Sequence, residues 1–170
     1  MERMGLGVHK MLNRLLVVCL GNICRSPALE VVLKTMIKKK GLEDRVWVES
    51  RGLSEKQVGK PFDAHIADEL MKRGYDISSG HAAQIIQEED FLTFDTILAV
   101  DKYVLQRLME KRPEKSKALI DLVSRWSPLQ EEIFDPYKQS EERIRECLDL
   151  IETQARYVMD AISGSLHETK

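Results

Sequence analysis

Residues 15–27 of the chain read LLVVCLGNICRSP, and this segment carries the pattern from which the fold can be inferred. Residues 15–18 form a continuous apolar run, which is typical of a strand buried on both faces. The loop from Cys19 to Ser26 follows, and Pro27 opens an apolar helical pattern at the position that proline favours. Ser26 is the expected helix cap. The segment therefore predicts a buried strand, a tight loop and a helix in direct succession.

The alternation of strand and helix patterns continues beyond this unit. Further strands are expected at 46–48, 96–100 and 118–120, further helices at 63–73, through 105–108 and at 144–162, and loops at 50–61 and 124–139. Strands that alternate with helices form a parallel sheet covered by helices. We therefore predict an α/β fold: a single domain with a central four-stranded parallel sheet, helices on both faces, and a phosphate-binding loop between strand 1 and helix 1.

The length of 170 residues suits one domain with a substantial core. We expect a flexible N-terminal extension at 1–14, the folded domain at 15–165 and a C-terminal tail at 166–170. Acidic and basic residues are interspersed and the formal net charge is −2, so neither a nucleic-acid surface nor a membrane surface is indicated. No apolar run approaches the ~20 residues of a membrane span.

The cysteine content indicates the compartment. The chain has three cysteines, and two of them lie in one short loop. This arrangement is not a disulfide framework and favours a reducing compartment, so we expect a cytoplasmic protein.

The loop at 19–26 has the chemistry of an anion pocket that contains a nucleophile. A helix N-terminus presents unpaired N–H groups and partial positive charge. Gly21 and Asn22 both tolerate positive φ, so the amides around them can turn inward and surround an anion. Arg25 can hold two oxygens of a phosphate group. Such surroundings favour the thiolate of Cys19, and the loop predicts hydrolysis of phosphate esters through a cysteinyl-phosphate intermediate.

The other two cysteines allow several interpretations. Cys24 could form a disulfide with Cys19 on oxidation, or it could be a small packing residue, and both remain open. Zinc fits this pair poorly, because no histidine pair lies nearby in the sequence. Cys147 lies on the apolar face of the last helix, where we expect it in the core.

Five segments of the chain resemble the low-molecular-weight protein tyrosine phosphatases, and the similarity runs from about residue 15 to the last helix. They are VCLGNICRSP at 18–27, ESRG at 49–52, GHAA at 80–83, FDTILAVD at 94–101 and DPY at 135–137. The first and the last of these are the most specific. The resemblance implies a phosphatase of the tyrosine type that acts on phosphorylated protein or on small aryl phosphates and needs no metal and no cofactor.

The resemblance also implies catalytic roles for three residues. Cys19 would be the nucleophile and Arg25 the phosphate-binding fork. Asp135 would protonate the leaving oxygen and then activate water. Among the acidic residues of the chain, only its place in a long irregular loop favours Asp135 independently of the resemblance.

The remaining site residues follow from the same resemblance. Ser26 would donate a hydrogen bond to the sulfur of Cys19, and Ser50 and His81 would support the loop together with Asn22. The phosphate-binding positions are Leu20, Gly21, Asn22, Ile23, Cys24 and Ser26, and the pocket-rim positions are Lys56, Tyr137 and Lys138.

Four positions depart from the family pattern. Lys56 replaces a rim aromatic, Lys138 replaces a second tyrosine, Gln84 replaces an arginine and Val104 replaces an asparagine. The first two changes remove aromatic walls that would stack on a phenyl ring, and they add positive charge. Two lysines at the rim favour an acidic substrate.

Three other functions share parts of this pattern. Relatives that act on phosphoarginine place threonine where this chain has Ile23. Arsenate reductases of similar fold need further cysteines downstream of the loop, and Cys147 is the only one here. A non-catalytic phosphoprotein-binding module would use the same amides and Arg25 without turnover.

Overall fold

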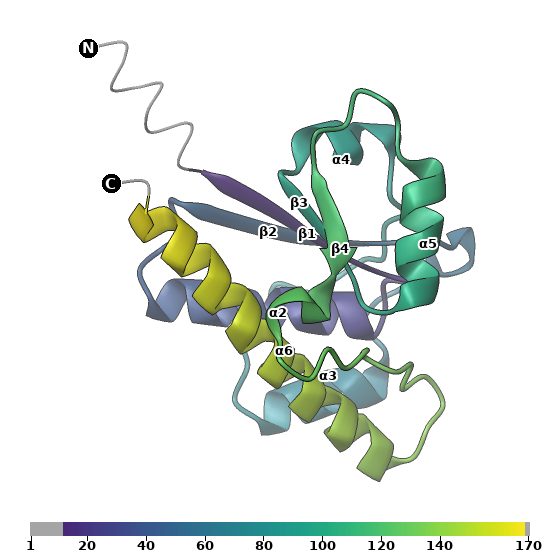
Figure 1. Ribbon diagram of the computed structural model, residues 1–170. Helices are drawn as coiled ribbons and strands as arrows, with labels where there is room; N and C mark the ends of the chain where they lie inside the picture. The colour runs from purple at the N-terminus through teal and green to yellow at the C-terminus, as the bar shows by residue number, and fades with distance from the viewer. Residues whose placement is uncertain (1–11, 169–170) are drawn as a thin grey trace.

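The computed structural model describes residues 12–168, and a four-stranded parallel sheet lies at its centre (Figure 1). The strands are β1 Asn13–Cys19, β2 Val46–Gly52, β3 Thr96–Ala99 and β4 Leu119–Leu122, in the order β2-β1-β3-β4. All three neighbouring pairs are parallel. The predicted fold class is confirmed.

Strand β1 lies inside the sheet, between β2 and β3, and its apolar run is fully buried. Leu15, Leu16, Val17 and Val18 are each 0% exposed, as a continuous apolar run between two neighbouring strands requires. At its end Cys19 pairs in register with Gly52 of β2. Ligands of parallel sheets bind beyond the carboxyl ends of the strands, so the loop after Cys19 lies where such a site belongs.

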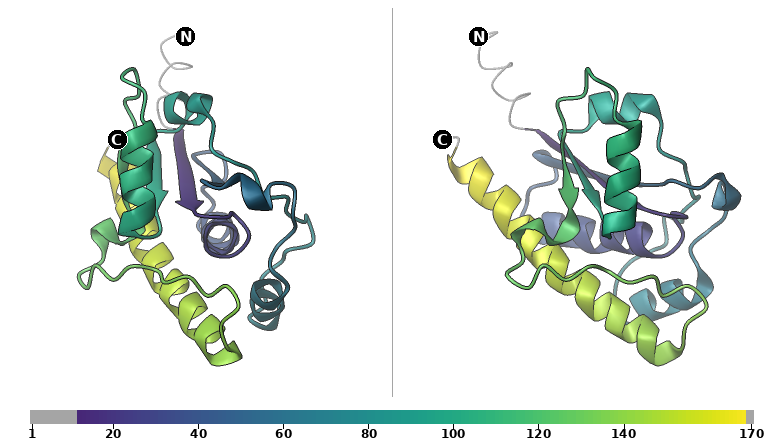
Figure 2. Two further views of the ribbon diagram at one scale, coloured as in Figure 1. Left: turned by 90° about the vertical axis from the view of Figure 1, so that its right-hand side faces the viewer. Right: turned by 45° about the vertical axis from the view of Figure 1, so that its right-hand side comes forward.

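Helices cover both faces of this sheet. Helix α2 (Arg25–Lys39) packs against β1 and β2 and also against α6 (Glu141–Glu168), which in turn contacts α3 (Ala64–Lys72). Helix α5 (Lys102–Lys111) packs against β3 and β4, and the short α4 (Glu88–Thr93) precedes β3. Helix α6 crosses α2 where the two pack together: in the left view of Figure 2, α2 is seen nearly end-on while α6 is seen at length. No helix of the described residues is both long and apolar enough to cross a membrane.

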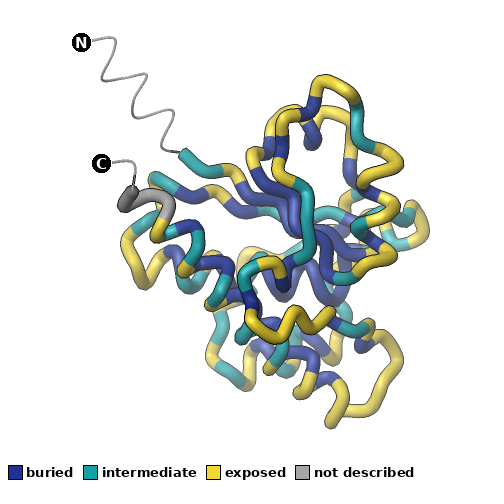
Figure 3. Tube along the Cα trace, viewed as in Figure 1, coloured by how far each residue is buried: buried dark blue, intermediate teal, exposed yellow. Residues whose placement is uncertain are grey.

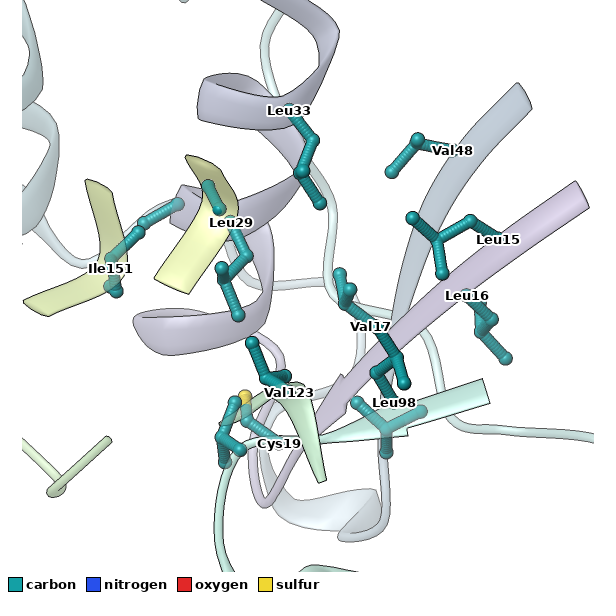
Figure 4. Close-up of a cluster of buried hydrophobic side chains, with 14 of the residues drawn as sticks. Leu15, Leu16, Val17, Cys19, Leu29, Leu33, Val48, Leu98, Val123 and Ile151 are labelled. Atoms are coloured by element: carbon teal, nitrogen blue, oxygen red, sulfur yellow. The ribbon is translucent and has the colours of Figure 1, made fainter. Parts of the chain in front are cut away.

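The apolar core joins the sheet to α2 and α6. Figure 3 shows the buried positions concentrated in the central strands and on the inner sides of the helices. Figure 4 shows Leu29 and Leu33 of α2 and Ile151 of α6 among the side chains of the strands, with Cys19 at the edge of this core. Cys147 is also fully buried, as predicted.

Both ends of the domain differ from the prediction. Strand β1 begins at Asn13 rather than at 15, because the Asn13 amide donates to the carbonyl of Arg45 (2.8 Å) and the Arg14 amide donates to the Asp95 carboxylate (2.8 Å). Residues 13–14 therefore belong to the sheet. Of the rest of the expected extension, only residue 12 is described, and residues 1–11 lie outside the described residues. Helix α6 continues to Glu168, so residues 166–168 are helical rather than part of a tail.

The predicted loops contain regular structure. Strand β2 continues to Gly52, and short 3-10 turns occupy Glu55–Gln57 and Val123–Trp126. Outside these loops, the short helix α4 was not predicted. Helix α2 begins at Arg25, two residues before Pro27, and Ser26 does not cap it. Instead, the Ser26 hydroxyl lies between the sulfur of Cys19 and the carbonyl of Arg51, so it is used by the loop.

Candidate active site

The loop that joins β1 to α2 opens onto a pocket of about 210 Å³. The pocket is lined by residues of the loop at 19–25, by Ser54, Lys56 and Gln57, and by Asp135 and Tyr137. Three segments that are distant in the sequence therefore meet here, and they include the predicted nucleophile, arginine and acid.

The sulfur of Cys19 is surrounded by hydrogen-bonding groups. Cys19 is 2% exposed, and its sulfur lies 3.0 Å from the hydroxyl oxygen of Ser26 and accepts a hydrogen bond from the backbone N–H of Asn22 at 3.2 Å. The N-terminus of α2 lies directly after the loop. Each of these groups stabilises negative charge on the sulfur, either as a hydrogen-bond donor or through the helix dipole.

Asn22 holds the loop in its shape. Its φ of 58° lies in the left-handed region, which asparagine tolerates better than most residues. The side-chain amide donates to the hydroxyls of Ser26 (2.8 Å) and Ser50 (3.0 Å), and its oxygen accepts from the backbone N–H of Gln84 (2.9 Å). The carbonyl of Asn22 lies 2.6 Å from the His81 ring nitrogen Nε2. The loop is thus tied to β2 and to the segment after α3.

Two further contacts tighten this support. The Ser50 hydroxyl donates to the Glu30 carboxylate at 2.6 Å, which fixes the orientation in which Ser50 receives the Asn22 amide. Gly52 lies against the loop so closely that a Cβ atom there would be 3.0 Å from the backbone nitrogen of Asn22. A larger residue at this position of β2 would require the backbone of the loop to give way by a few tenths of an ångström.

Arg25 is held by two acceptors and keeps one side of its guanidinium group available. It is 4% exposed, and Nη1 donates to the Asp101 carboxylate (2.7 Å) and to the carbonyl of Ile133 (2.9 Å). Burial alone would lower the pKa of Arg25, but the Cys19 sulfur and Asp101 raise that pKa above its ordinary value. Within residues 12–168, Nε and Nη2 have no partner, so they can bind two oxygens of one anion.

The backbone of the loop supplies further donors. The N–H groups of Gly21, Ile23, Cys24 and Arg25 donate to no other group in the described part of the chain. Amides at a helix N-terminus with no internal acceptor form a site for an anion. Together with the Arg25 guanidinium, they suit the equatorial oxygens of a phosphoryl group bound above Cys19.

The predicted acid and rim residues lie in the pocket with one exception. Asp135 and Tyr137 line it, and the Tyr137 amide donates to Oδ1 of Asp135 at 3.0 Å. Lys56 lines it from the segment after β2. Lys138 is not among the lining residues; its ammonium group lies 5.4 Å from the centre of the Tyr137 ring, on which it packs.

Three residues at the site were not assigned to it from the sequence. Ser54 and Gln57 line the pocket but have no distinctive pattern in the sequence. Asp101, the last residue of the family-like segment 94–101, pairs with Arg25. It directly follows the strand next to β1, so knowledge of the strand order would have placed it at this edge of the sheet.

The other cysteines have different surroundings. Burial raises the pKa of the Cys24 thiol, and the nearby Asp63 and Cys19 add to this effect. Burial likewise raises the pKa of Cys147, to about 12. Both residues are therefore favoured as neutral thiols, and Cys147 is enclosed in α6, away from the exposed position that a thiol relay needs.

A thiol beneath a ring of free amides and an arginine, with a carboxylate facing the same pocket, is the arrangement expected for a phosphatase. Residues 14–168 match the sequence model of the low molecular weight phosphotyrosine protein phosphatases. A putative low molecular weight protein-tyrosine-phosphatase of Synechocystis sp. is 33% identical over 158 residues, covering 90% of this chain and 98% of that protein. The rat low molecular weight phosphotyrosine protein phosphatase is 38% identical over 125 residues, covering 72% and 78%.

Solved structures agree with these sequence comparisons. A protein tyrosine phosphatase of Entamoeba histolytica, with Hepes in its active site, superposes with a TM-score of 0.83 at 28% identity and covers 90% of this chain and 98% of its own. A low molecular weight phosphotyrosine phosphatase of Vibrio cholerae gives 0.80 at 32% identity, covering 88% and 95%. The chain belongs to the low molecular weight phosphotyrosine protein phosphatase family and is a hydrolase of phosphoric monoesters.

The contact between Gly52 and the loop leads to a first prediction. We expect Gly52→Ala to push the loop away from β2, because the added Cβ would lie 3.0 Å from backbone atoms of Gly21 and Asn22, which would have to give way. Overpacking of this kind costs about 1–3 kcal/mol of stability. The inhibition constant of vanadate should rise at least about tenfold, equivalent to roughly 1.4 kcal/mol of lost oxyanion binding.

Gly164→Ala is the matched control, since nothing lies within 4 Å of the Cβ it would add on α6. It should leave vanadate inhibition unchanged. An unchanged inhibition constant in Gly52→Ala as well would contradict the close fit of the loop against β2.

Proposed function

We propose that the chain hydrolyses phosphotyrosine and related aryl phosphate esters in two steps, with Cys19 as nucleophile. The observation that carries this proposal is the sulfur of Cys19, which faces the same pocket as Arg25 and Asp135 and accepts hydrogen bonds that stabilise a thiolate. The names of the relatives support tyrosine as the phosphorylated residue.

In the first step, the Cys19 thiolate attacks phosphorus and a sulfur–phosphorus bond forms as the ester oxygen–phosphorus bond breaks. The free amides of the loop and the Nε and Nη2 groups of Arg25 stabilise the equatorial oxygens while their charge changes. Asp135 transfers its proton to the leaving oxygen, so the product leaves as a neutral phenol.

In the second step, water attacks the phosphorus of the cysteinyl phosphate. Asp135, now ionised, takes a proton from that water, and the sulfur–phosphorus bond breaks. The Ser26 hydroxyl stabilises the departing thiolate, since its oxygen lies 3.0 Å from the sulfur. Inorganic phosphate is released and the enzyme returns to its starting form.

Ser50 and His81 support this chemistry through Asn22 and do not touch the substrate. Their contacts keep the left-handed turn at Asn22, which directs the amides of the loop toward the phosphate. Loss of either contact would lower affinity for the oxyanion because the amides would no longer be preorganised.

The rim gives the substrate its second contact. Tyr137 offers one aromatic surface, on which the phenyl ring of the substrate can stack. Lys56 lies in the same lining, is exposed and forms no ion pair within the described residues. Lys138, packed on Tyr137, adds a second positive charge beside the pocket. We therefore propose phosphoproteins with acidic residues next to the phosphotyrosine as preferred substrates.

We also propose that the protein acts in the cytoplasm. All three cysteines are free thiols, and a catalytic thiolate needs a reducing compartment to remain active.

The nucleophile is tested by Cys19→Ser with p-nitrophenyl phosphate as substrate and a chelator in the buffer. The wild-type chain should turn over the substrate under these conditions, and the variant should lose about a thousandfold or more in kcat, because a serine hydroxyl is not ionised at neutral pH. Wild-type turnover in the variant would contradict the mechanism. A wild-type chain that binds vanadate yet never turns over substrate would instead indicate a phosphoprotein-binding module.

The acid is tested by Asp135→Asn with a series of aryl phosphates. Asparagine keeps an oxygen to accept from the Tyr137 amide, but its NH2 group is too weak an acid to transfer a proton to the leaving oxygen. We expect kcat/KM to fall by about 10²–10⁴ for poor leaving groups and far less for dinitrophenolate, since general acid catalysis matters most where the leaving oxygen is basic. An equal loss across the series would argue against Asp135 as the acid.

The charge of the rim is tested with phosphotyrosine peptides that differ in acidic or neutral flanking residues. Lys56→Met should lower the preference for the acidic peptide by about two- to fivefold, the size expected for one exposed ion pair, and added salt should reduce the wild-type preference in the same way. Lys60→Met is the control, because Lys60 is also exposed but does not line the pocket. Equal effects of the two variants would exclude a specific contact at Lys56.

A further inference from the structure

The segment that carries Asp135 is mostly exposed, yet its backbone is held by side chains from other elements. We call residues 127–139 the acid loop. Nε2 of Gln154 donates to the carbonyl of Glu131 at 3.0 Å, and Nη1 of Arg25 donates to that of Ile133 at 2.9 Å. The Cys147 thiol lies 3.6 Å from the carbonyl of Phe134 and donates to it. Three carbonyls in the four residues before Asp135 are thus bound.

Gln154 differs from the other two donors. Arg25 serves the phosphate group, and Cys147 is a small side chain that packs well in the core. Gln154 is 1% exposed on the apolar face of α6, beside Ala155 and in line with Ile151. Its side-chain oxygen has no hydrogen-bond partner within the described residues.

A buried amide with an unmet acceptor is unfavourable for stability. An apolar side chain of the same length would pack at this position without that cost. The contact that the amide does make is its bond to the Glu131 carbonyl, which ties α6 to the acid loop. The amide of Gln154 therefore contributes to where the acid loop lies.

Only three residues separate Glu131 from Asp135, and this short stretch is constrained by further contacts. Ile133 is 1% exposed and its amide donates to the carbonyl of Val100. The Arg143 guanidinium lies 3.7 Å from the centre of the Phe134 ring. Oδ1 of Asp135 accepts from the Tyr137 amide, which restrains the carboxylate. The backbone just before Asp135 is restrained by the bond from Cys147 to the Phe134 carbonyl.

We infer that Gln154 is a positioning residue for Asp135: by holding the Glu131 carbonyl from α6, it keeps the acid loop where the carboxylate can protonate the leaving oxygen. This inference rests on the proposed role of Asp135 as the acid. Gln154 does not line the pocket, so it acts only through the loop. Small displacements of a catalytic group are costly, because proton transfer depends on its alignment with the reacting atom.

The test is Gln154→Met, which keeps the length of the side chain and removes the donor. We expect kcat/KM for phenyl phosphate to fall about tenfold and that for dinitrophenyl phosphate to change less than about twofold, because only the poor leaving group needs the aligned acid. Vanadate inhibition should be unchanged, since the phosphate-binding loop is untouched. Gln106→Met, at an exposed glutamine on α5, is the matched control and should behave as wild type.

A double-mutant cycle separates this inference from the proposed function. In the Asp135→Asn background, Gln154→Met should cause no further loss, because the residue whose position it controls no longer donates a proton. If Asp135→Asn shows no dependence on the leaving group, the proposed role of Asp135 fails. If Asp135→Asn shows that dependence and Gln154→Met does not, the role of Gln154 fails alone.

A purely structural role would give a different result. An equal loss for both esters, or weaker vanadate inhibition, would overturn the inference and assign Gln154 to general stability. Thermal unfolding of each variant establishes that the assays report native protein. If Gln154→Met is not folded, Gln154→Leu repeats the test with another apolar side chain on the same face of α6. The same dependence on the leaving group is expected for it.

Discussion

The left-handed turn at Asn22 is the constraint on which the rest of the site depends. A strand that entered a helix by the usual route would leave its amides pointing in several directions. Here the turn brings the amides together over the sulfur of Cys19. The conformation is held by three partners of the Asn22 side chain: the hydroxyls of Ser26 and Ser50 and the amide of Gln84. The strain of the turn is thus offset by one contact within the loop, to Ser26, and by two contacts from outside it, to Ser50 and Gln84.

The order of strands explains how those contacts are available. Because β1 lies between β2 and β3, the carboxyl ends of all three strands meet at the same edge of the sheet. Strand β2 supplies Ser50 and the bare backbone of Gly52, and the end of β3 leads to Asp101, which pairs with Arg25. Each neighbour of the nucleophile strand therefore fixes a different part of the same loop, one the backbone turn and the other the arginine.

The parts of the site that could be predicted are those whose chemistry is local in the sequence. Cys19 and Arg25 lie six residues apart between a strand and a helix, so their meeting needs no knowledge of the fold. Asp135 was chosen by resemblance, with only its place in a long irregular loop as independent support, because its approach to Cys19 depends on the path of that loop. Asp101 was missed for the same physical reason: its contact with Arg25 arises from strand order, which periodicity does not reveal.

Errors at the element ends have equally specific causes. Ser26 has the composition of a helix cap, but its hydroxyl is taken by the sulfur of Cys19, and α2 begins earlier without it. The polar residues after Val48 indicate a loop by composition, whereas Ser50 and Gly52 are buried there because the phosphate loop covers them. In both cases, a functional contact overrides the local preference of the residue.

The two halves of the pocket differ in how they are anchored, and this has a consequence for local opening. The amides of β1 are enclosed between two strands and beneath α2, so their hydrogen exchange requires cooperative unfolding of the whole domain. The acid loop is exposed and is held mainly by side-chain bonds, which can break one at a time. Proteolysis and amide exchange should therefore reach the segment around Asp135 well before the nucleophile strand opens. Opening of the acid loop would remove Asp135 from the pocket and the Ile133 carbonyl from Arg25, while the amides of the phosphate-binding loop would keep their support from β2.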